Sequence, residues 1–388
     1  AANVAVTETT QAATAGGEAA PSAIVLIVVD TLRTDRLSLY GHTRATTPRL
    51  EALAREATVY ERAYATAPWT TPSVASLLSS HYPTEIGVVN LDRAVPDSVV
   101  MLPERLRDAG YATGAVVSHD FVSAKWGFDQ GFDEFDERFV RGPQAVTSEG
   151  ISALAEEWIE RHADERFFLF VHYFDPHYAY VEHADTTFGP HDYRGWFRSG
   201  MTLPDFMTDE HPLGLDEADL DEVRRIYDSE IAFTDRAIGR VLDALRAHGR
   251  WDDALVVVTA DHGEEFLDHG ALNHTKTLYD ELVRVPLVVR YPGRAPARVA
   301  TPVAVIDLYP TVLDVAGLAP DAALRGRSLA RLDADAPPRP IFLETSFGQD
   351  LDGERRTRRL RAVVLAGELL GAACGTTEPE VVDAPIAR

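Results

Sequence analysis

Short apolar runs alternate with amphipathic segments along most of the chain. Runs such as Ile24–Val29 and Leu255–Ala260 are continuously apolar, which is typical of central parallel strands. The predicted strands are Ile24–Val29, Ala112–Ser118, Phe167–Phe174, Leu255–Ala260 and Pro286–Arg290, and the predicted helices are Thr47–Ala57, Leu102–Ala109, Ser148–His162, Leu220–His248 and Leu308–Ala316. Because strands and helices alternate, the pattern predicts an α/β fold: a doubly wound, mostly parallel central sheet with helices on both faces.

Three sections of the chain differ in composition. Residues 1–22 are rich in Ala, Thr, Glu and Gly without periodicity, and we expect a disordered leader there. Residues 23–318 carry the alternating pattern and form the predicted main domain. Residues 319–388 become rich in Ala, Arg and Pro, with strand candidates at Ile341–Glu344 and Leu360–Leu365, and predict a small C-terminal subdomain. Such a leader fits a tether behind a cleaved export signal, so we expect a periplasmic or secreted protein, with a cytoplasmic location as the alternative.

Composition narrows the class of protein. The 388 residues are 45% hydrophobic and 25% charged, as in ordinary globular chains, and no apolar run approaches the roughly 20 residues of a membrane span. A net charge of −24 argues against nucleic-acid binding, which requires basic surfaces. Cys374 is the single cysteine, which excludes a disulfide framework and a cysteine-based zinc site. Only two of the 37 basic residues are lysines, Lys125 and Lys276, so a specific need for an ammonium group is suspected at both.

Candidate metal ligands follow the predicted strands. Asp30 and Asp261 come directly after apolar runs, His262 follows Asp261, and Asp175 ends a third strand. Because ligands bind beyond the carboxyl ends of parallel strands, Asp30, Asp261 and His262 are expected to meet there and to form a divalent-metal site. The alternative is that these acids cap the helices that follow.

A second candidate feature is the segment from Ala67 to Leu78. Pro72 suits a first helical turn, which puts Thr70 and Thr71 at a helix N-terminus, where backbone N–H groups favour an anion. A threonine hydroxyl that also contacts a metal can serve as a nucleophile. The alternative is a plain threonine N-cap.

These residues belong to a longer set of motifs. VVDTLRTDRLSLYG (28–41), APWTTPSVASLLSSHYP (67–83), TADHGE (259–264) and HTKTLYDELVRVP (274–286) resemble, in this order, the sulfatase family of the alkaline phosphatase superfamily. The resemblance runs from about residue 24 to 317. It implies an alkaline-phosphatase-like fold and a sulfatase-like catalytic domain over residues 23–318.

The resemblance also implies roles for individual residues. Asp30, Asp261 and His262 match the metal ligands, and Thr70 stands where sulfatases place the Cys or Ser that matures to formylglycine, so it resembles the nucleophile and a further metal contact. Lys125 and Lys276 match lysines that bind the transferred anion and assist the leaving group. By the same likeness, His177 resembles the general acid, while His274 and Thr71 are expected to contact substrate.

Three positions depart from the family pattern. Thr31 follows Asp30 where the family usually has a second acid, and Val74 replaces the Arg of the maturation motif. Thr70 cannot become formylglycine, because that conversion needs Cys or Ser. A threonine ester has no elimination route for product release, so water must attack it directly with the help of a base.

The predicted function is therefore metal-dependent hydrolysis of an anionic ester through Thr70, with no formylglycine. Phosphodiesters, phosphomonoesters or phosphonates are favoured. The alternatives are a sulfatase that works without formylglycine, a phosphoryl transferase, and an inactive glycan-binding homologue. The expected substrate is an anionic small molecule, glycan or lipid headgroup, and the sequence does not define an oligomeric state.

The expected cofactor is one divalent metal ion. The mixture of imidazole and carboxylate ligands favours Mn²⁺, Zn²⁺ or Mg²⁺, with Ca²⁺ possible. A second ion, which Asp175, His177 and His274 would hold, is the less favoured alternative.

Overall fold

The structure is a computed structural model that describes residues 20–141, 146–189, 192–202, 214–332, 336–346, 359–365, 368–374 and 379–380. Most of the predicted leader, residues 1–19, lies outside the described residues. The predicted boundaries between leader, main domain and C-terminal subdomain stay predictions.

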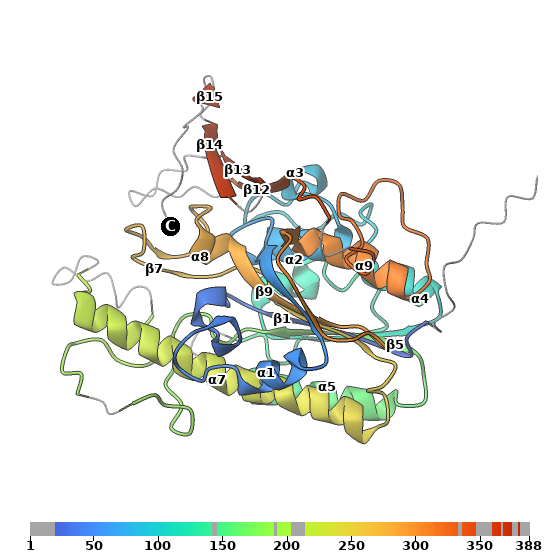
Figure 1. Cartoon of the computed structure of the whole chain (residues 1–388), viewed down its shortest axis with the longest axis horizontal. Coiled ribbons are helices and arrows are strands. Elements are labelled where there is room, and N and C mark those ends of the chain that lie inside the picture. Colours follow the sequence, from blue (N-terminus) through green and yellow to red (C-terminus); the bar gives the residue numbers. More distant parts are fainter. Residues whose placement is uncertain are drawn as a thin grey trace, which may run out of the picture.

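A nine-stranded sheet forms the centre of the molecule (Figure 1). Its order is β10-β2-β9-β6-β1-β5-β3-β4, with β11 also paired to β2. The middle strands β6, β1, β5 and β3 run parallel, as the continuous apolar runs predicted. The strands are β1 Ala23–Val29, β2 Thr58–Tyr64, β3 Ala112–Val117, β4 Glu134–Asp136, β5 Phe167–Tyr173, β6 Leu255–Ala260, β9 Arg284–Arg290, β10 Ala297–Val299 and β11 Val303–Ala304.

Helices cover both faces of the sheet, which confirms the predicted α/β architecture (Figure 1). On one face lie α1 (Pro48–Ala54), α5 (Ser148–Arg161) and α7 (Glu217–Ala247), and on the other lie α2 (Thr70–Ser79), α4 (Leu102–Asp108) and α9 (Leu308–Val315). Short helices complete the set: α3 Pro83–Ile86, α8 Asp280–Val283, and the 3₁₀ turns η1 Thr34–Arg36, η2 Ser38–Tyr40, η3 Asp120–Val122, η4 Ala124–Trp126 and η5 Val305–Asp307. Within the described part of the chain, no helix has the length and apolar character needed to cross a membrane.

Several strands differ from the expectation, and the short strands β4, β10 and β11 were not predicted. The sequence analysis missed β2, because Glu61 and Arg62 interrupt its apolar run and its register with β9 shifts between Tyr60 and Ala63. The predicted strand at β9 exists, but it runs antiparallel to both β6 and β2. The chain leaves β6 at the carboxyl edge of the sheet and enters β9 at that same edge. A parallel β9 would require a crossover that carries the chain back to the opposite edge, and residues 261–283 do not form one.

The C-terminal strands form a separate antiparallel sheet of β12 (Ile341–Thr345), β13 (Arg359–Leu365), β14 (Glu368–Cys374) and β15 (Pro379–Glu380). Ile341 and Leu343 of β12 are buried in one cluster with Tyr64 and Leu282, and the Glu344 N–H donates to the Thr66 carbonyl at 2.9 Å. The small sheet therefore packs against segments at the carboxyl edge. A two-stranded ribbon, β7 (Glu265–Phe266) with β8 (Leu272–Asn273), lies in the chain between β6 and β9.

Packing between β3 and α5 leaves no room for a side chain at Gly114. A Cβ there would overlap the indole of Trp158, which is itself buried. We expect Gly114→Ala to lower the free energy of unfolding by about 1–3 kcal/mol, the usual cost of an overpacked core. Urea denaturation followed by circular dichroism measures this cost. An unchanged midpoint would show that α5 moves aside freely.

Candidate active site

The four predicted metal ligands converge at the carboxyl edge of the sheet. Asp30 directly follows β1, Asp261 and His262 follow β6, and Thr70 begins α2. All four side chains are buried. The Nε2 atom of His262 lies 3.3 Å from Thr70 Oγ1, 3.4 Å from Asp30 Oδ1 and 3.5 Å from Asp261 Oδ2. Asp30 and His262 are 232 positions apart in the sequence, so residues from distant segments form one compact group.

The carboxylates of this group lack the partners that burial requires. No well-formed hydrogen bond from a described residue reaches either oxygen of Asp30 or Oδ2 of Asp261. Burial, together with the charges of Asp261 and Glu264, raises the pKa of Asp30 well above its ordinary value. Burial likewise raises the pKa of Asp261 to about 8. Unpaired buried carboxylates are unfavourable, so a cation is the partner that this arrangement calls for.

The residues fit a divalent ion. The Nδ1–H of His262 donates to the Gly263 carbonyl at 2.9 Å, which leaves the Nε2 lone pair directed at the group. A tetrahedral ion with bonds of about 2.1 Å has ligand–ligand separations of about 3.4 Å. The three distances from Nε2 agree with that value.

The turn after β1 is shaped around Asp261. Thr31 has φ of 52°, a left-handed conformation that a β-branched residue rarely adopts and that costs about 1–3 kcal/mol. In this conformation the Thr31 N–H points to Asp261 Oδ1 at 3.3 Å, and the Thr31 carbonyl accepts from the Tyr227 hydroxyl at 2.6 Å. The Thr31 backbone therefore contacts the Asp261 carboxylate, and its side chain adds no further acid to the group.

Helix α2 holds Thr70 against the same group. Ser73 donates from its hydroxyl to the Asp261 carbonyl at 2.6 Å, and Thr71 donates to the Phe121 carbonyl at 3.2 Å. Thr70 itself is 2% exposed and begins the helix, as predicted, without capping it through its side chain. Its hydroxyl is therefore free of the capping role that was the alternative explanation for this residue.

Four further histidines surround this group: His119, His172, His177 and His274. Ring nitrogens of His119 and His177 lie within 4.8 Å of an Asp30 oxygen, and the ring centroids of His274 and His262 lie 4.5 Å apart with the rings tilted by 40°. The sequence analysis had identified His177 and His274 but not His119 or His172. His119 lies just beyond the end of β3, as Asp30 lies just beyond the end of β1. The expectation that ligands bind beyond strand ends could therefore have identified His119 as well.

His172 is an unusual core residue. It lies on β5 in register with Val28, is fully buried, and neither ring nitrogen has a hydrogen-bond partner among the described residues. Burial lowers its pKa to about 3, which keeps the ring neutral. His172 could not be recognised as a site residue from the sequence, because the apolar run FFLFVHYF around it predicts only a strand.

The two lysines lie outside this buried group. The Lys125 side chain is 64% exposed, lies 3.5 Å from Asp120 and rests over the Trp126 ring. Lys276 is also exposed, two residues beyond His274. Both occupy surface positions, so any contact with substrate would involve its outer parts.

Asp175 has a different task from the metal contact that was considered for it. Its carboxylate accepts from the N–H groups of Thr147 (3.0 Å) and Ser148 (2.7 Å) and from the Ser148 hydroxyl (2.6 Å). It therefore caps the start of α5 from the end of β5.

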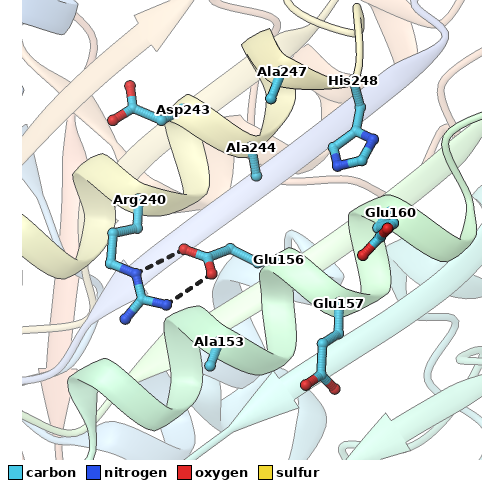
Figure 2. A pocket seen from close by; sticks show the side chains of 9 residues that line it. All are labelled: Ala153, Glu156, Glu157, Glu160, Arg240, Asp243, Ala244, Ala247 and His248. Atoms are coloured by element: carbon cyan, nitrogen blue, oxygen red, sulfur yellow. Dashed lines mark hydrogen bonds and ion pairs between the residues drawn. The ribbon is translucent and has the colours of Figure 1, made fainter.

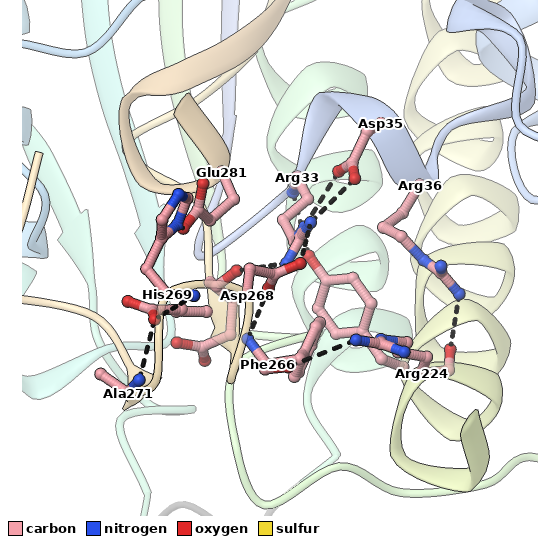
Figure 3. A network of polar contacts seen from close by, with 12 residues as sticks. Arg33, Asp35, Arg36, Arg224, Phe266, Asp268, His269, Ala271 and Glu281 are labelled. Atoms are coloured by element: carbon pink, nitrogen blue, oxygen red, sulfur yellow. Dashed lines mark hydrogen bonds and ion pairs between the residues drawn. The ribbon is translucent and has the colours of Figure 1, made fainter. Parts of the chain in front are cut away.

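Two further features of the molecule help to delimit the site. Arg33 is buried and joins Asp35 to Asp268, and its Nη1 donates to the Glu264 carbonyl at 2.9 Å, so the turn after β1 is fixed to the segment after His262 (Figure 3). A hollow of about 490 Å³ between α5 and α7 contains none of the predicted residues. Its walls carry acidic side chains and the Glu156–Arg240 ion pair (Figure 2).

A buried hydroxyl beside two carboxylates and an imidazole, at the carboxyl edge of an α/β sheet, defines the alkaline-phosphatase-like class of ester hydrolases. The family model Sulfatase matches residues 22–318, and the chain belongs to the sulfatase family. It is accordingly a hydrolase of ester bonds, as the sequence motifs implied.

Known proteins agree with this assignment. The Escherichia coli (strain K12) protein named uncharacterized sulfatase YidJ is 25% identical over 378 residues, covering 82% of this chain and 72% of that protein. The structure of BT4656 in complex with its substrate D-glucosamine-2-N,6-O-disulfate superposes with a TM-score of 0.76 at 19% identity, covering 94% of this chain and 90% of that one. The phosphonate monoester hydrolase of Agrobacterium radiobacter gives 0.69 at 22%, covering 91% and 88%. At these identities the structural likeness shows the shared fold.

The unpaired carboxylates predict a strong link between metal binding and stability. After chelation, we expect one equivalent of Zn²⁺ or Mn²⁺ to bind per chain and to stabilise the fold by about 2.7 kcal/mol at a hundredfold excess over Kd. Asp261→Asn weakens this effect. Elemental analysis and thermal denaturation measure both quantities. His269→Ala, which disrupts a separate Glu265–His269–Glu281 group, is the control. Two equivalents bound to the intact chain would contradict the single-ion site.

The cap on α5 predicts a purely structural effect for Asp175. Asp175→Ala leaves two backbone N–H groups and a hydroxyl without their acceptor, and we expect it to lower the free energy of unfolding by about 2–3 kcal/mol. Metal stoichiometry stays the same. Urea titration with elemental analysis tests this, and a lost equivalent of metal would return Asp175 to the list of ligands.

Proposed function

We propose that the chain is a metal-dependent esterase whose nucleophile is Thr70. The observation that carries the proposal is the placement of the Thr70 hydroxyl, buried at the start of α2 and 3.3 Å from His262 Nε2. Among the described residues, no well-formed hydrogen bond reaches the neighbouring oxygens of Asp30 or Oδ2 of Asp261. The Thr70 hydroxyl therefore has the surroundings that convert a threonine into a nucleophile.

Asp30, Thr70, Asp261 and His262 would hold the ion. When bound, it would neutralise charge on the transferred group and lower the pKa of the Thr70 hydroxyl. One imidazole with two carboxylates favours Mn²⁺, Zn²⁺ or Mg²⁺, with Ca²⁺ as the alternative.

The residues divide the reaction into two steps. Thr70 Oγ loses its proton to solvent and attacks the central phosphorus or sulfur in line, and the bond to the leaving oxygen breaks as that oxygen departs as an anion or takes up a proton. Water then attacks the same atom and releases Thr70. We propose that His177 contacts the leaving oxygen. Its Nδ1–H is held by the Tyr178 carbonyl at 2.8 Å, so donation from Nε2 requires a second proton on the ring.

Charged residues at the rim extend the proposed substrate contacts. We propose that Lys125 and Lys276, both exposed, bind the anionic substrate, and that His274 and Thr71 contact it as well. A glycan, a lipid headgroup or a small anionic molecule would fit these proposed contacts. An extracytoplasmic location remains part of the proposal.

Phosphorus esters are the first choice of substrate: phosphodiesters, phosphomonoesters or phosphonates. The threonine supports this choice, because its ester has to be opened by water and cannot collapse to an aldehyde. Sulfate esters are the second candidate. Sulfate esters are supported by the sulfatases among the relatives of the chain, and the structural neighbour BT4656 acts on a sulfated glucosamine.

Substitution of Thr70 tests the proposal. With p-nitrophenyl esters of phosphate, phenylphosphonate and sulfate and with bis-p-nitrophenyl phosphate, we expect Thr70→Ala to lower kcat/KM by at least about 1,000-fold. Metal content stays near that of the wild type, because the other three ligands remain. We expect the phosphorus esters to be turned over faster than the sulfate.

The other outcomes are equally informative. Faster turnover of the sulfate would identify a sulfatase that works without formylglycine. Product esters of an added alcohol would indicate a phosphoryl transferase. Substantial activity in Thr70→Ala would rule out Thr70 as the nucleophile, and metal-dependent glycan binding without any turnover would indicate an inactive homologue.

A further inference from the structure

The second step of the proposed reaction needs a base, because water is a poor nucleophile toward a threonine ester. We propose that His274 is this base and that Glu264 and Tyr180 are its positioning residues. This inference rests on the proposed function and extends it to residues that the sequence analysis left without this role.

The three residues form a continuous hydrogen-bonded chain. The Nδ1–H of His274 donates to Glu264 Oε1 at 3.0 Å, and the Tyr180 hydroxyl donates to Glu264 Oε2 at 3.0 Å. The Glu264 side chain is fully buried, Tyr180 is 4% exposed and the His274 side chain 10%. Each carboxylate oxygen thus has a donor, and the carboxylate cannot rotate without breaking one of these bonds.

This chain fixes the protonation pattern of His274. Because an ionised carboxylate only accepts, the ring proton of neutral His274 stays on Nδ1 and the lone pair is on Nε2. A carboxylate behind an imidazole also stabilises the cation that forms when Nε2 takes a proton, as in the catalytic triads of hydrolases. His274 is therefore built to accept a proton at Nε2.

The fold places the His274 ring beside the group formed by Asp30, Thr70, Asp261 and His262. The His274 ring lies 4.5 Å from the His262 ring and 5.1 Å from the His177 ring, measured between centroids. The next residue, Thr275, donates its N–H to the Pro68 carbonyl at 2.9 Å, which joins this loop to the segment that leads into Thr70. Asn273 and Thr275 both adopt positive φ, so the loop conformation around His274 is tightly constrained.

The support behind Glu264 is rigid as well. Arg33 donates to the Glu264 carbonyl at 2.9 Å, and the Gly263 N–H donates to the Leu282 carbonyl at 2.8 Å (Figure 3 shows the surroundings of Arg33). A Cβ at Gly263 would overlap the Glu281 carbonyl, so the backbone passes closely there.

The neighbouring imidazoles are less suited to the task. His119 accepts the Phe121 N–H at Nδ1 (3.1 Å), so its proton is on Nε2 and this nitrogen can only donate. His177 has the opposite tautomer, but a neutral backbone carbonyl stands behind it in place of a carboxylate. Among these rings, His274 alone combines an accepting Nε2 with a carboxylate partner.

Proton transfer and the exchange of bonds at phosphorus or sulfur occur together in this step. A water molecule loses a proton to His274 Nε2 while its oxygen bonds to the phosphorus or sulfur of the Thr70 ester. The bond between that atom and Thr70 Oγ breaks, and Thr70 Oγ recovers a proton from the imidazolium, directly or through solvent. The lone pair of His274 Nε2 is then available again, and the Nδ1–H bond to Glu264 is kept throughout.

Accumulation of the Thr70 ester tests the inference. With bis-p-nitrophenyl phosphate or p-nitrophenyl sulfate, whichever the wild type turns over, the good leaving group needs no acid, so the first step stays fast in His274→Ala and Glu264→Gln. We expect steady-state turnover to fall by about 100- to 1,000-fold. Before the steady state is reached, we expect a burst of p-nitrophenol that approaches one equivalent per chain, measured by stopped flow. Mass spectrometry of the peptide that contains Thr70 detects the bound group.

The controls separate positioning from simple loss of structure. Glu281→Gln alters another His–Glu pair, with His269, in which the two side chains lie 2.6 Å apart outside the site, and we expect no burst. Tyr180→Phe removes one bond to Glu264 and gives a smaller burst, and it serves as the milder variant where Glu264→Gln folds poorly. Metal content and thermal midpoint are compared for every variant.

Two contrary results have different meanings. If the first turnover falls as much as the steady state and no ester accumulates, while Thr70→Ala is inactive, the role of His274 and Glu264 is overturned and the proposed function stands. If Thr70→Ala stays active and no variant carries the ester, the proposed function fails, and this inference fails with it.

Discussion

Two carboxylates, Asp30 and Asp261, end neighbouring strands of a sheet that is covered on both faces, and their oxygens share a space without enough donors. The rest of the site is arranged around this unfavourable pair. His262 fixes its Nδ1–H on a backbone carbonyl and presents its lone pair to both acids. Thr31 adopts a left-handed conformation that directs one amide at Asp261. Charge compensation by a cation would turn this destabilising pair into a stable centre, so metal binding and folding depend on the same residues.

The parts of the molecule that local pattern dictates could be predicted from sequence. Continuous apolar runs gave β1, β5 and β6, and the strand-end rule identified Asp30 and Asp261 because parallel strands deliver their ends to one edge. Strand β2 was not predicted because charged residues interrupt its apolar run. The antiparallel direction of β9 was not predicted because the direction of a strand depends on the edge at which the chain re-enters the sheet. The buried His172 and the partners of Glu264 are set by contacts between distant segments, which no local pattern encodes.

Histidine illustrates the same limit at the level of a single side chain. The sequence records only that an imidazole is present, whereas the surrounding donors and acceptors decide which nitrogen carries the proton. At His119 a backbone amide makes Nε2 a donor, while at His262 a backbone carbonyl makes Nε2 an acceptor. Rings that look interchangeable in the printed sequence therefore have different chemistry. Membership of the sulfatase family fixes the class of reaction, which is the hydrolysis of ester bonds.

The antiparallel direction of β9 has a further consequence. Residues 261–283 leave the sheet and re-enter it at the same edge, so their length is independent of the registers of β6 and β9, which pair through their own backbones. Insertions or deletions in the exposed part of this excursion, away from its fixed contacts, would leave the core intact. The exposed part of the excursion is thus a segment that can change in length while Asp261, His262 and Glu264, at its start, keep their buried positions.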